Sequence, residues 1–582
     1  MSGKLSKISR VIEAFVSAHP YVLLGVDLRG RIVYQTNEGG FNSIWVLDSS
    51  GRRRLSQKTV LWTTEVSESR DRVVFTRDIA RGRELQKLGY IDLSRDEEII
   101  IDDIEPMRIF SIVNKSSMII FTGATEKSIA LYMIRRDSVE KLVELANIVF
   151  ATDASDDLVV GSGNLRGNPR SSEIFIYNIS TGEMKIYTPR EGSSNTIPMI
   201  LSDGRIVFQT DALDPDRRIL ATLDPHTEEF REMKFKYDDY ERYKPVENLF
   251  YREFREGFLV IGKREGRSRL FLDGREIQTP AGMIVNADIY ENKIYYTYTN
   301  IFKPPRIIAS ENGVHKEIIG SRLPEDIENS LESIEFTYIE SLDKLRIPVF
   351  IIRSREYENK KAAVVYIHGG PWSEVADSWS ILIASLVASG FNVIAPNFRG
   401  STGYGEWFRR LDIGDPGGGD LMDIEASARY ALEKGIGEKL FVMGYSYGGY
   451  MTLWTMFSKP DLFECGVAGA AIADWEEMYE LSDALFRKFI EVLFDGRRDL
   501  MKERSPIHKA ENLRKPLCIV QPQNDTRTPL KPIIRLVSKL MEHGKSFEIH
   551  IAPDMGHVIS TIDDAIKILL PALLFLQRCA ER

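Results

Sequence analysis

The sequence predicts a two-domain protein in which a seven-bladed β-propeller precedes an α/β domain. At 582 residues the chain is too long for a single hydrophobic core. Short β-branched and aromatic runs repeat over residues 21–320, whereas apolar runs alternate with helical stretches in the rest of the chain. We therefore expect the all-β propeller over residues 21–325 and the α/β domain over residues 326–582.

The first 20 residues predict an amphipathic helix that docks on the α/β domain. Four apolar residues recur at helical spacing: Leu5, Ile8, Ile12 and Phe15. Pro20 ends the pattern, and polar residues interrupt the apolar ones. The segment therefore lacks the continuous apolar stretch of a signal peptide.

Seven similar units follow the helix, and each contains two strand-like runs whose starts lie 11 to 23 residues apart. Successive units begin 36 to 52 residues apart, at Tyr21, Val73, Met118, Leu158, Ile206, Phe258 and Ile294. A β-sandwich would place about seven strands in roughly 100 residues, so a repeat over about 300 residues favours a propeller. Residues 321–335 look like a polar linker between the domains.

Six buried strand-like runs lie beyond this linker, at residues 362–368, 391–396, 439–444, 465–470, 516–522 and 547–552. Helical stretches lie among them at residues 420–434, 447–457 and 562–579. This alternation indicates parallel strands that are covered on both faces. Functional side chains are expected at the carboxyl ends of such strands.

Residues 444–448 read Gly-Tyr-Ser-Tyr-Gly and fit the pattern G-x-S-x-G. A chain of this length contains that pattern by chance with a probability of about 0.2, so its context decides. A strand-like run precedes Ser446 and a helical stretch follows it, which is the context of a nucleophile elbow. We therefore predict Ser446 as a nucleophile, with an inert glycine turn as the alternative.

A serine nucleophile needs a histidine base and an acid that orients the base. Of the eight histidines, His557 lies after the last strand and before the last helix, in the chain order Ser, Asp, His. Asp525 directly follows the run 516–522, whereas Asp554 shares the short loop of His557 and is expected to cap that turn. His557 and Asp525 are thus the predicted base and acid.

The negative oxygen formed during acyl transfer needs backbone N–H donors. One is expected from Tyr447, directly after the nucleophile, and one from Gly370 or Gly369 in the motif HGGPW. His368 of that motif is expected to be structural. The glycine-rich residues 414–420 are expected to form a loop beside the active site.

Other functions find little support in the sequence. A formal charge of −9 gives no sign of a nucleic-acid-binding face, and no apolar stretch is long enough to span a membrane. We found no zinc or nucleotide motif and expect no metal or organic cofactor. The three cysteines are expected to be buried thiols, which favours the cytosol, and the scarcity of glutamine hints at heat adaptation.

In these motifs the sequence resembles the prolyl oligopeptidase family of serine peptidases, in which a seven-bladed propeller covers an α/β-hydrolase domain. The motifs are HGGPW, PNFRGSTGYG, GYSYGGY, NDTRTP and DMGH, in that order along the chain. The residues of these motifs are most similar to those of the acylaminoacyl-peptidases of heat-loving archaea. The resemblance implies that Ser446, Asp525 and His557 form the triad and that Arg527 binds a peptide carbonyl of the substrate.

The resemblance also indicates which branches of the family are most similar to this sequence. Members that cut after proline have asparagine directly after the nucleophile, and Tyr447 stands here instead, as in the acylaminoacyl and dipeptidyl branches. Residues 474–490 look like a helical lid whose Trp475, Phe486 and Phe489 line an apolar pocket for the side chain before the cut bond. A plain core stripe is the equal alternative.

We expect a serine peptidase that releases an N-acylated amino acid from short peptides, with the propeller excluding folded proteins. A dipeptidyl peptidase and a broad carboxylesterase of the same fold are the rival enzymes. The non-enzyme alternative is a propeller interaction module with an inactive hydrolase domain. The expected partners are short, N-acylated peptides, and the oligomeric state is left open, a homodimer included.

Overall fold

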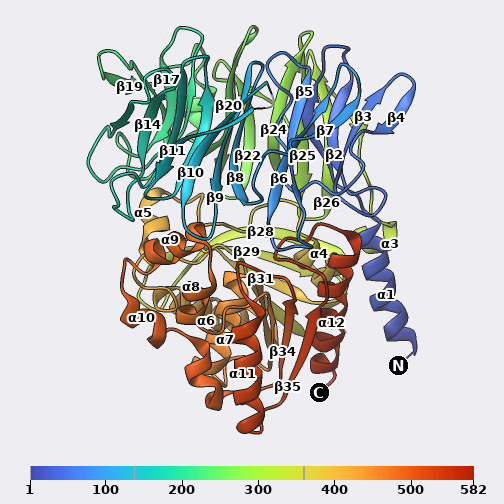
Figure 1. The fold of residues 1–582 in the computed structure, drawn as a ribbon. Helices are drawn as coiled ribbons and strands as arrows, with labels where there is room; N and C mark the ends of the chain where they lie inside the picture. Colours follow the sequence, from blue (N-terminus) through green and yellow to red (C-terminus); the bar gives the residue numbers. More distant parts are fainter. Residues whose placement is uncertain (1, 137, 358–360) are drawn as a thin grey trace.

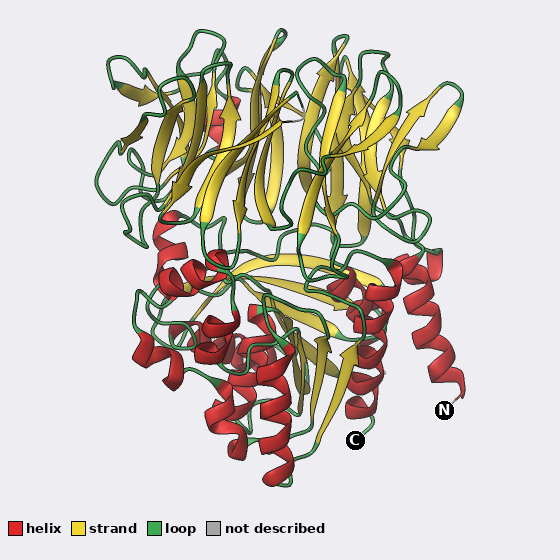
Figure 2. Cartoon of the chain, viewed as in Figure 1, coloured by secondary structure: helices red, strands yellow, loops and turns green. Residues whose placement is uncertain are grey.

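The computed structural model describes residues 2–136, 138–357 and 361–582, and it shows two domains stacked on one another (Figure 1, Figure 2). Within these residues the upper domain holds seven small antiparallel sheets, and the lower domain holds one eight-stranded sheet with helices around it. The prediction of a seven-bladed propeller followed by an α/β-hydrolase domain is therefore confirmed.

The propeller strands follow one another in chain order, so each blade is a meander of neighbouring strands. They are β1 (Tyr21–Val26), β2 (Ile32–Thr36), β3 (Ser43–Asp48), β4 (Gly51–Arg54), β5 (Arg72–Asp78), β6 (Gln86–Asp92), β7 (Glu97–Ile100), β8 (Arg108–Lys115), β9 (Met118–Ala124), β10 (Ile129–Arg135), β11 (Ser138–Leu145), β12 (Val149–Ala154), β13 (Leu158–Gly163), β14 (Glu173–Asn178), β15 (Met184–Tyr187), β16 (Asn195–Ile200), β17 (Ile206–Thr210), β18 (Ile219–Leu223), β19 (Phe230–Glu232), β20 (Glu247–Phe254), β21 (Gly257–Arg264), β22 (Arg267–Leu272), β23 (Arg275–Ile277), β24 (Met283–Tyr290), β25 (Lys293–Asn300), β26 (Lys303–Glu311) and β27 (Val314–Ile319). Helix α2 (Asp239–Tyr243) precedes β20.

The second blade has three named strands, β5 to β7, within the described residues. An irregular segment hydrogen-bonds along β5 instead of a regular first strand. The N–H of Leu61 donates to the carbonyl of Thr76 at 2.9 Å, and the N–H of Thr64 donates to the carbonyl of Val74 at 2.9 Å. The first strands of neighbouring blades contact one another, as β12 does with β8 and β16, so these strands surround the propeller axis.

The first and last blades meet without exchanging a strand, because β1 to β4 form one sheet and β24 to β27 form another. Hydrogen bonds between side chains and backbone join them. The N–H of Leu23 donates to Thr297 Oγ1 at 2.9 Å, and the N–H of Val26 donates to Asp288 Oδ2 at 2.8 Å. Arg70 is also paired with Asp288, at 2.7 Å.

The α/β sheet has the strand order β28-β29-β31-β30-β32-β33-β34-β35, and the strands from β31 to β35 in that order are parallel. The strands are β28 (Leu331–Glu340), β29 (Arg346–Ser354), β30 (Ala362–Ile367), β31 (Asn392–Pro396), β32 (Lys439–Tyr445), β33 (Cys465–Gly469), β34 (Leu517–Pro522) and β35 (Phe547–Ala552). The helices are α3 (Glu325–Glu328), α4 (Ile381–Ala388), α5 (Glu406–Arg409), α6 (Gly419–Glu433), α7 (Tyr447–Ser458), α8 (Trp475–Leu481), α9 (Ala484–Leu493), α10 (Arg498–Glu503), α11 (Leu530–Glu542) and α12 (Ile562–Ala580), with 3-10 turns η2 (Arg410–Asp412) and η3 (Pro506–Asn512).

The interpretation of residues 321–335 as a linker was wrong at its end. Helix α3 occupies residues 325–328, and the edge strand β28 begins at Leu331. Only one of the ten β28 residues is buried, so its composition resembles that of a loop. Strand β29 was not predicted either, although it is largely buried. It pairs antiparallel with β31, whereas the alternation of apolar runs with helices indicated only parallel strands.

Helix α1 (Ser2–Val16) lies beside α12 (Figure 1) and packs on the α/β domain. Val11 and Phe15 are fully buried in the same core cluster as residues of α4 and α12. The side chain of Leu5 lies outside the described residues. Among the described helices, none is long and apolar enough to cross a membrane.

Replacing Phe15 with alanine is expected to destabilise the α/β domain by about 3–5 kcal/mol, because it leaves a cavity where an aromatic side chain was buried. The Phe15 ring lies 5.5 Å from the ring of Trp379. The midpoint of urea unfolding measures the effect, and Ser9→Ala at an exposed position of the same helix is the control. Equal midpoints for the two variants would contradict a stabilising role of the helix.

Candidate active site

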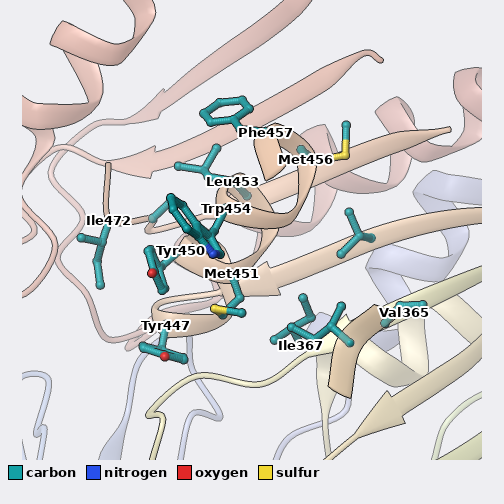
Figure 3. Close-up of a cluster of buried hydrophobic side chains, with 14 of the residues drawn as sticks. Val365, Ile367, Tyr447, Tyr450, Met451, Leu453, Trp454, Met456, Phe457 and Ile472 are labelled. Carbon is teal, nitrogen blue, oxygen red and sulfur yellow. The ribbon is translucent and has the colours of Figure 1, made fainter. Parts of the chain in front are cut away.

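Ser446 lies in a tight turn between the end of β32 and the start of α7. Its backbone angles are φ 62° and ψ −123°, a strained conformation for a residue with a side chain. Close packing enforces the turn. A Cβ atom on Gly448 would lie 2.0 Å from the carbonyl oxygen of Ile367, and one on Gly444 would lie 2.3 Å from that of Gly448. Figure 3 shows the side chains of α7, among them Tyr447 and Met451, beside Ile367 and Val365 of β30.

A chain of hydrogen bonds links the three residues predicted as a triad. His557 Nε2 lies 3.0 Å from Ser446 Oγ, and His557 Nδ1 lies 2.7 Å from Asp525 Oδ2. Asp525 follows β34 and His557 follows β35, so both side chains come from the carboxyl edge of the sheet, where Ser446 also lies. This geometry allows the imidazole to accept the serine proton while the carboxylate orients the ring.

The environment of Asp525 favours its ionised form. Burial alone would raise the pKa of Asp525, but the His557 imidazole and the hydrogen bonds that the carboxylate accepts outweigh burial, so its pKa is lowered. The donors include the N–H groups of Arg527 and Thr528, each at 2.9 Å, and the Thr528 hydroxyl at 2.7 Å. Asp525 is thus held as a carboxylate that can stabilise an imidazolium.

The predicted oxyanion donors lie beside Ser446. Tyr447 is the first residue of α7, so its N–H is one of those that have no acceptor within the helix. A Cβ atom on Gly369 would lie 3.2 Å from Ser446 Cβ and 3.8 Å from its Oγ, so the loop that carries Gly369 and Gly370 passes directly by the serine.

His368 of the same loop uses both ring nitrogens for structural contacts. Its Nε2 lies 2.8 Å from Ser401 Oγ, and its Nδ1 lies 2.7 Å from the carbonyl oxygen of Gly369. The ring also stacks on Phe398, with 4.3 Å between centroids. Burial lowers the pKa of His368 to about 4, so this side chain is neutral at pH 7.

Arg527 lies at the boundary between the domains and is paired with Glu84 of the propeller. Its Nε lies 3.0 Å and 2.9 Å from the two carboxylate oxygens of Glu84. Glu84 is also paired with Arg108, whose Nε lies 2.5 Å from Asp483 Oδ2. Glu84 and Arg108 are almost completely buried, so this ion-pair network lies in the interior of the protein.

A cavity of about 1040 Å³ inside the propeller reaches this network. Glu84, Arg108, Phe486 and Arg527 form part of its wall, and strands of the propeller supply most of the rest. The cavity therefore leads from the interior of the propeller toward the residues next to Asp525.

The predicted lid over residues 474–490 consists of two short helices, α8 and α9. The prediction that Trp475 lines a pocket was wrong, because its side chain has no exposed surface. Its ring lies 5.0 Å from that of Tyr450 and 5.2 Å from that of Phe494. Large aromatic side chains fill the core in this way, so Trp475 is a core residue.

Phe486 and Phe489 of helix α9 are both partly exposed. The guanidinium carbons of Arg108 and Arg527 lie 4.8 Å and 5.8 Å from the centre of the Phe486 ring, so both arginines contact this ring. Phe489 packs edge-on against Trp372, with 5.4 Å between ring centroids. Phe486 lines the cavity described above, and Phe489 packs beside the loop of Gly369.

Among the described residues, one group of side chains has ligand atoms close enough to hold a metal ion, within 4.8 Å of one another: Cys518, Glu548 and His550. Cys518 and Glu548 lie near the amino ends of β34 and β35, at the edge of the sheet opposite to the triad. Arg578 Nη2 lies 2.5 Å and 2.6 Å from the Glu548 carboxylate oxygens, so a cationic group already occupies that carboxylate.

Several residues that contact the site had not been identified from the sequence. Thr528 orients Asp525, Glu84 binds Arg527 from the propeller side, and Arg108 is paired with the same Glu84. Thr528 lies in the quoted motif NDTRTP, which was a usable signal. Glu84 and Arg108 are separated from Arg527 by more than 400 residues, and no local pattern marks them.

The protein combines a propeller with an α/β sheet that carries a serine on a strained elbow. A hydrogen-bonded aspartate and histidine follow the last two strands of the chain. This is the architecture of a propeller-capped serine hydrolase. Residues 378–582 match the model of the prolyl oligopeptidase family, and residues 32–308 match the model described as the acylamino-acid-releasing enzyme-like N-terminal domain. The C-terminal domain therefore matches the prolyl oligopeptidase family.

The chain is similar to curated peptidases over part of its length. Dipeptidyl aminopeptidase BIII of Pseudoxanthomonas mexicana is 31% identical over 204 residues, which are 33% of this chain and 30% of that protein. The acylamino-acid-releasing enzyme of Homo sapiens is 26% identical over 229 residues, which are 37% of this chain and 31% of that protein. The match thus spans about 30% of the length of these relatives.

Solved structures resemble the whole chain. A puromycin-hydrolyzing peptidase of Mycobacterium tuberculosis has a TM-score of 0.81 at 16% identity and covers 98% of this chain and 95% of its own. The acylaminoacyl peptidase of Pyrococcus horikoshii has a TM-score of 0.71 at 19% identity and covers 98% and 97%. At these identities the similarity establishes the two-domain fold.

Replacing Asp525 with asparagine is expected to lower kcat by about 10⁴-fold with little change in KM, because the amide cannot stabilise the imidazolium or hold its tautomer. Steady-state kinetics on a chromogenic substrate measure the effect. Asp554→Asn, in the loop of His557, is the matched control and should retain activity. A loss that is larger for Asp554→Asn would instead assign the orienting role to Asp554.

His368 is expected to make the protein less stable in acid. Its pKa of about 4 in the folded protein lies below the ordinary value of 6.5, so between these pH values the unfolded chain binds the extra proton. Stability should therefore fall as the pH drops from 6.5 to 4, and His368→Gln should flatten this slope. Thermal midpoints across this range test it, with the exposed His543→Gln as control; identical slopes for all three proteins would contradict it.

Proposed function

We propose that the protein is a serine peptidase that releases an N-acylated amino acid from the N-terminus of short peptides. The observation that carries this proposal is the hydrogen-bonded chain from Ser446 through His557 to Asp525 at a nucleophile elbow. The matches to the prolyl oligopeptidase family and to an acylamino-acid-releasing enzyme-like domain support it.

The proposed reaction begins when His557 Nε2 accepts the proton of Ser446 and Ser446 Oγ attacks the peptide carbonyl. The N–H groups of Tyr447 and of Gly370 or Gly369 stabilise the negative charge on the carbonyl oxygen. The imidazolium then donates its proton to the leaving amine, which departs and leaves an acyl-enzyme. Water attacks this ester with His557 as base, and the N-acylated amino acid and Ser446 are released.

The charges beside Arg527 favour an acylated over a free amino terminus. A dipeptidyl peptidase must bind a free α-ammonium group with carboxylates, whereas Glu84 is already shared by Arg527 and Arg108. An ammonium group that bound Glu84 would have to displace one of these guanidinium groups, which leaves a buried charge unpaired. A neutral acyl group needs no such exchange, and its carbonyl oxygen is a suitable acceptor for Arg527.

The propeller is proposed to restrict substrates by size, since propeller residues form most of the wall of the cavity that reaches Arg527. Ester hydrolysis is a proposed side activity, because an acyl-enzyme forms from esters as well. The scarcity of cysteine and glutamine supports a cytosolic, heat-adapted enzyme as part of the proposal.

A panel of N-acetylated and free dipeptide anilides of the same sequence tests the proposal. We expect kcat/KM to be at least about tenfold higher for the acetylated members, which corresponds to about 1.4 kcal/mol in transition-state binding. A preference for the free amino terminus would favour the dipeptidyl peptidase, and ester turnover without anilide turnover would favour the carboxylesterase. Ser446→Ala measures the background rate.

A further inference from the structure

The glycine-rich segment 414–420 is a motif of the α/β domain that the proposed reaction leaves without a role. It connects η2 to α6 and packs tightly. A Cβ atom on Gly417 would lie 2.4 Å from the hydroxyl of Tyr450, and one on Gly419 would lie 2.4 Å from Arg399 Nη1. The glycines therefore allow the segment to lie deep in the core, between two buried carboxyl groups at its ends.

The first of these carboxyl groups is Asp420, which holds the side chain of Tyr447. Asp420 has no exposed surface, and the Tyr447 hydroxyl donates to its Oδ2 at 2.7 Å. The N–H groups of Gly417 and Leu421 donate to the same carboxylate at 3.0 Å and 2.8 Å. Tyr447 at the start of α7 (Figure 3) is the residue whose own N–H is proposed as an oxyanion donor. Asp420 thus fixes one side of the oxyanion hole through the side chain that follows the nucleophile.

The second carboxyl group is Asp412, which holds Trp372. The indole N–H of Trp372 donates to Asp412 Oδ1 at 3.1 Å. Trp372 ends the motif HGGPW, so its position is tied to Gly369 and Gly370, the other proposed source of oxyanion donors. Asp412 thus fixes the opposite side of the oxyanion hole.

Both carboxyl groups are expensive to bury. Oδ2 of Asp412 is buried and has no hydrogen-bond partner among the described residues. The pKa of Asp412 is raised to about 8, mainly by burial and also by the nearby Asp420, while the Trp372 hydrogen bond and Arg409 oppose this. Burial likewise raises the pKa of Asp420 to about 6. A buried carboxyl oxygen without a hydrogen-bond partner costs stability, and such atoms persist mainly where they serve a function.

We propose that Asp412 and Asp420 are positioning residues that hold the two halves of the oxyanion hole in register. Asp420 acts through the Tyr447 hydroxyl, and Asp412 acts through the Trp372 indole as a neutral acceptor. A neutral acceptor holds the loop without placing a second negative charge near the developing oxyanion. This inference rests on the proposed acyl-transfer function, but it concerns any substrate whose carbonyl oxygen becomes negative in the reaction.

Two variants each remove one of these two hydrogen bonds, and a third variant keeps an acceptor for the Trp372 indole. Tyr447→Phe removes the hydroxyl and leaves the backbone N–H, and Asp412→Ala removes the acceptor for Trp372. We expect each to lower kcat by about tenfold, a part of the 10²–10³-fold that one oxyanion donor contributes, with KM changed by less than about threefold. Asp412→Asn retains a neutral acceptor and is expected to stay within about twofold of the wild type.

A trifluoromethyl ketone that forms a tetrahedral adduct with serine provides a second readout. Its inhibition constant should rise by the same factor as kcat falls in Tyr447→Phe and Asp412→Ala, which a general loss of stability would not produce. Tyr240→Phe is the matched control, because Tyr240 is also buried and donates its hydroxyl, to Asn248 Oδ1 at 2.8 Å, but lies in the propeller. Circular dichroism establishes that each variant is folded.

Unchanged kcat and inhibitor affinity in Tyr447→Phe and Asp412→Ala would overturn the inference. So would an equal loss of kcat in Tyr240→Phe, or a loss in Asp412→Asn as large as that in Asp412→Ala. The measurements use p-nitrophenyl acetate alongside an acetylated anilide, because both form the same oxyanion. Failure of the peptidase proposal would appear as missing anilide cleavage by the wild type, while the ester series would still test the positioning residues.

Discussion

Ser446 occupies a backbone conformation that costs about 1–3 kcal/mol, and the packing around it keeps it there. Gly448 lets α7 approach β30 so closely that no side chain fits between them, and Gly444 makes the same approach possible from the strand side. Because this turn is rigid, the hydroxyl of Ser446 projects at the edge of the sheet where His557 and Asp525 also end. Every other feature of the site is placed relative to that turn.

Charged and polar groups with fixed positions surround Ser446. Asp525 is ionised by the donors that converge on it, whereas His368 is kept neutral by burial. The propeller adds Glu84 and Arg108 from above, so the carboxylate next to Arg527 is already neutralised. In a site shielded from water such fixed groups act more strongly than they would in solvent. The triad thus comes from the α/β domain, while the charges that surround Arg527 come largely from the propeller.

The sequence predicted those parts of the fold in which burial shows as an apolar run. Runs such as β9 and β10 are almost wholly buried and mark the middle of a blade, whereas β4 is fully exposed and carries three arginines, so it has no apolar signal. Edge strands lack that signal in general, which is why β28 was taken for a linker.

In the candidate site, too, some residues were predicted from local sequence patterns and others were not. Ser446, Asp525 and His557 follow strands, and their chain order indicated their relation. The prediction that Trp475 lines a pocket was wrong because an aromatic residue at the start of a helix can face either the core or a cleft. Only tertiary packing decides between these. The partners of Arg527 come from the other domain, and the contacts of Asp412 and Asp420 depend on tertiary packing, which no local pattern encodes.

All of the chemistry inferred for the site requires Ser446 to be an activated nucleophile in the folded protein. Reaction with a fluorophosphonate, followed by peptide mass spectrometry, tests it most directly, because this reagent modifies a serine whose proton a neighbouring base accepts. We expect one adduct per chain, located on Ser446 and abolished in His557→Ala. A folded protein that remains unmodified, or an adduct on another residue, would contradict it.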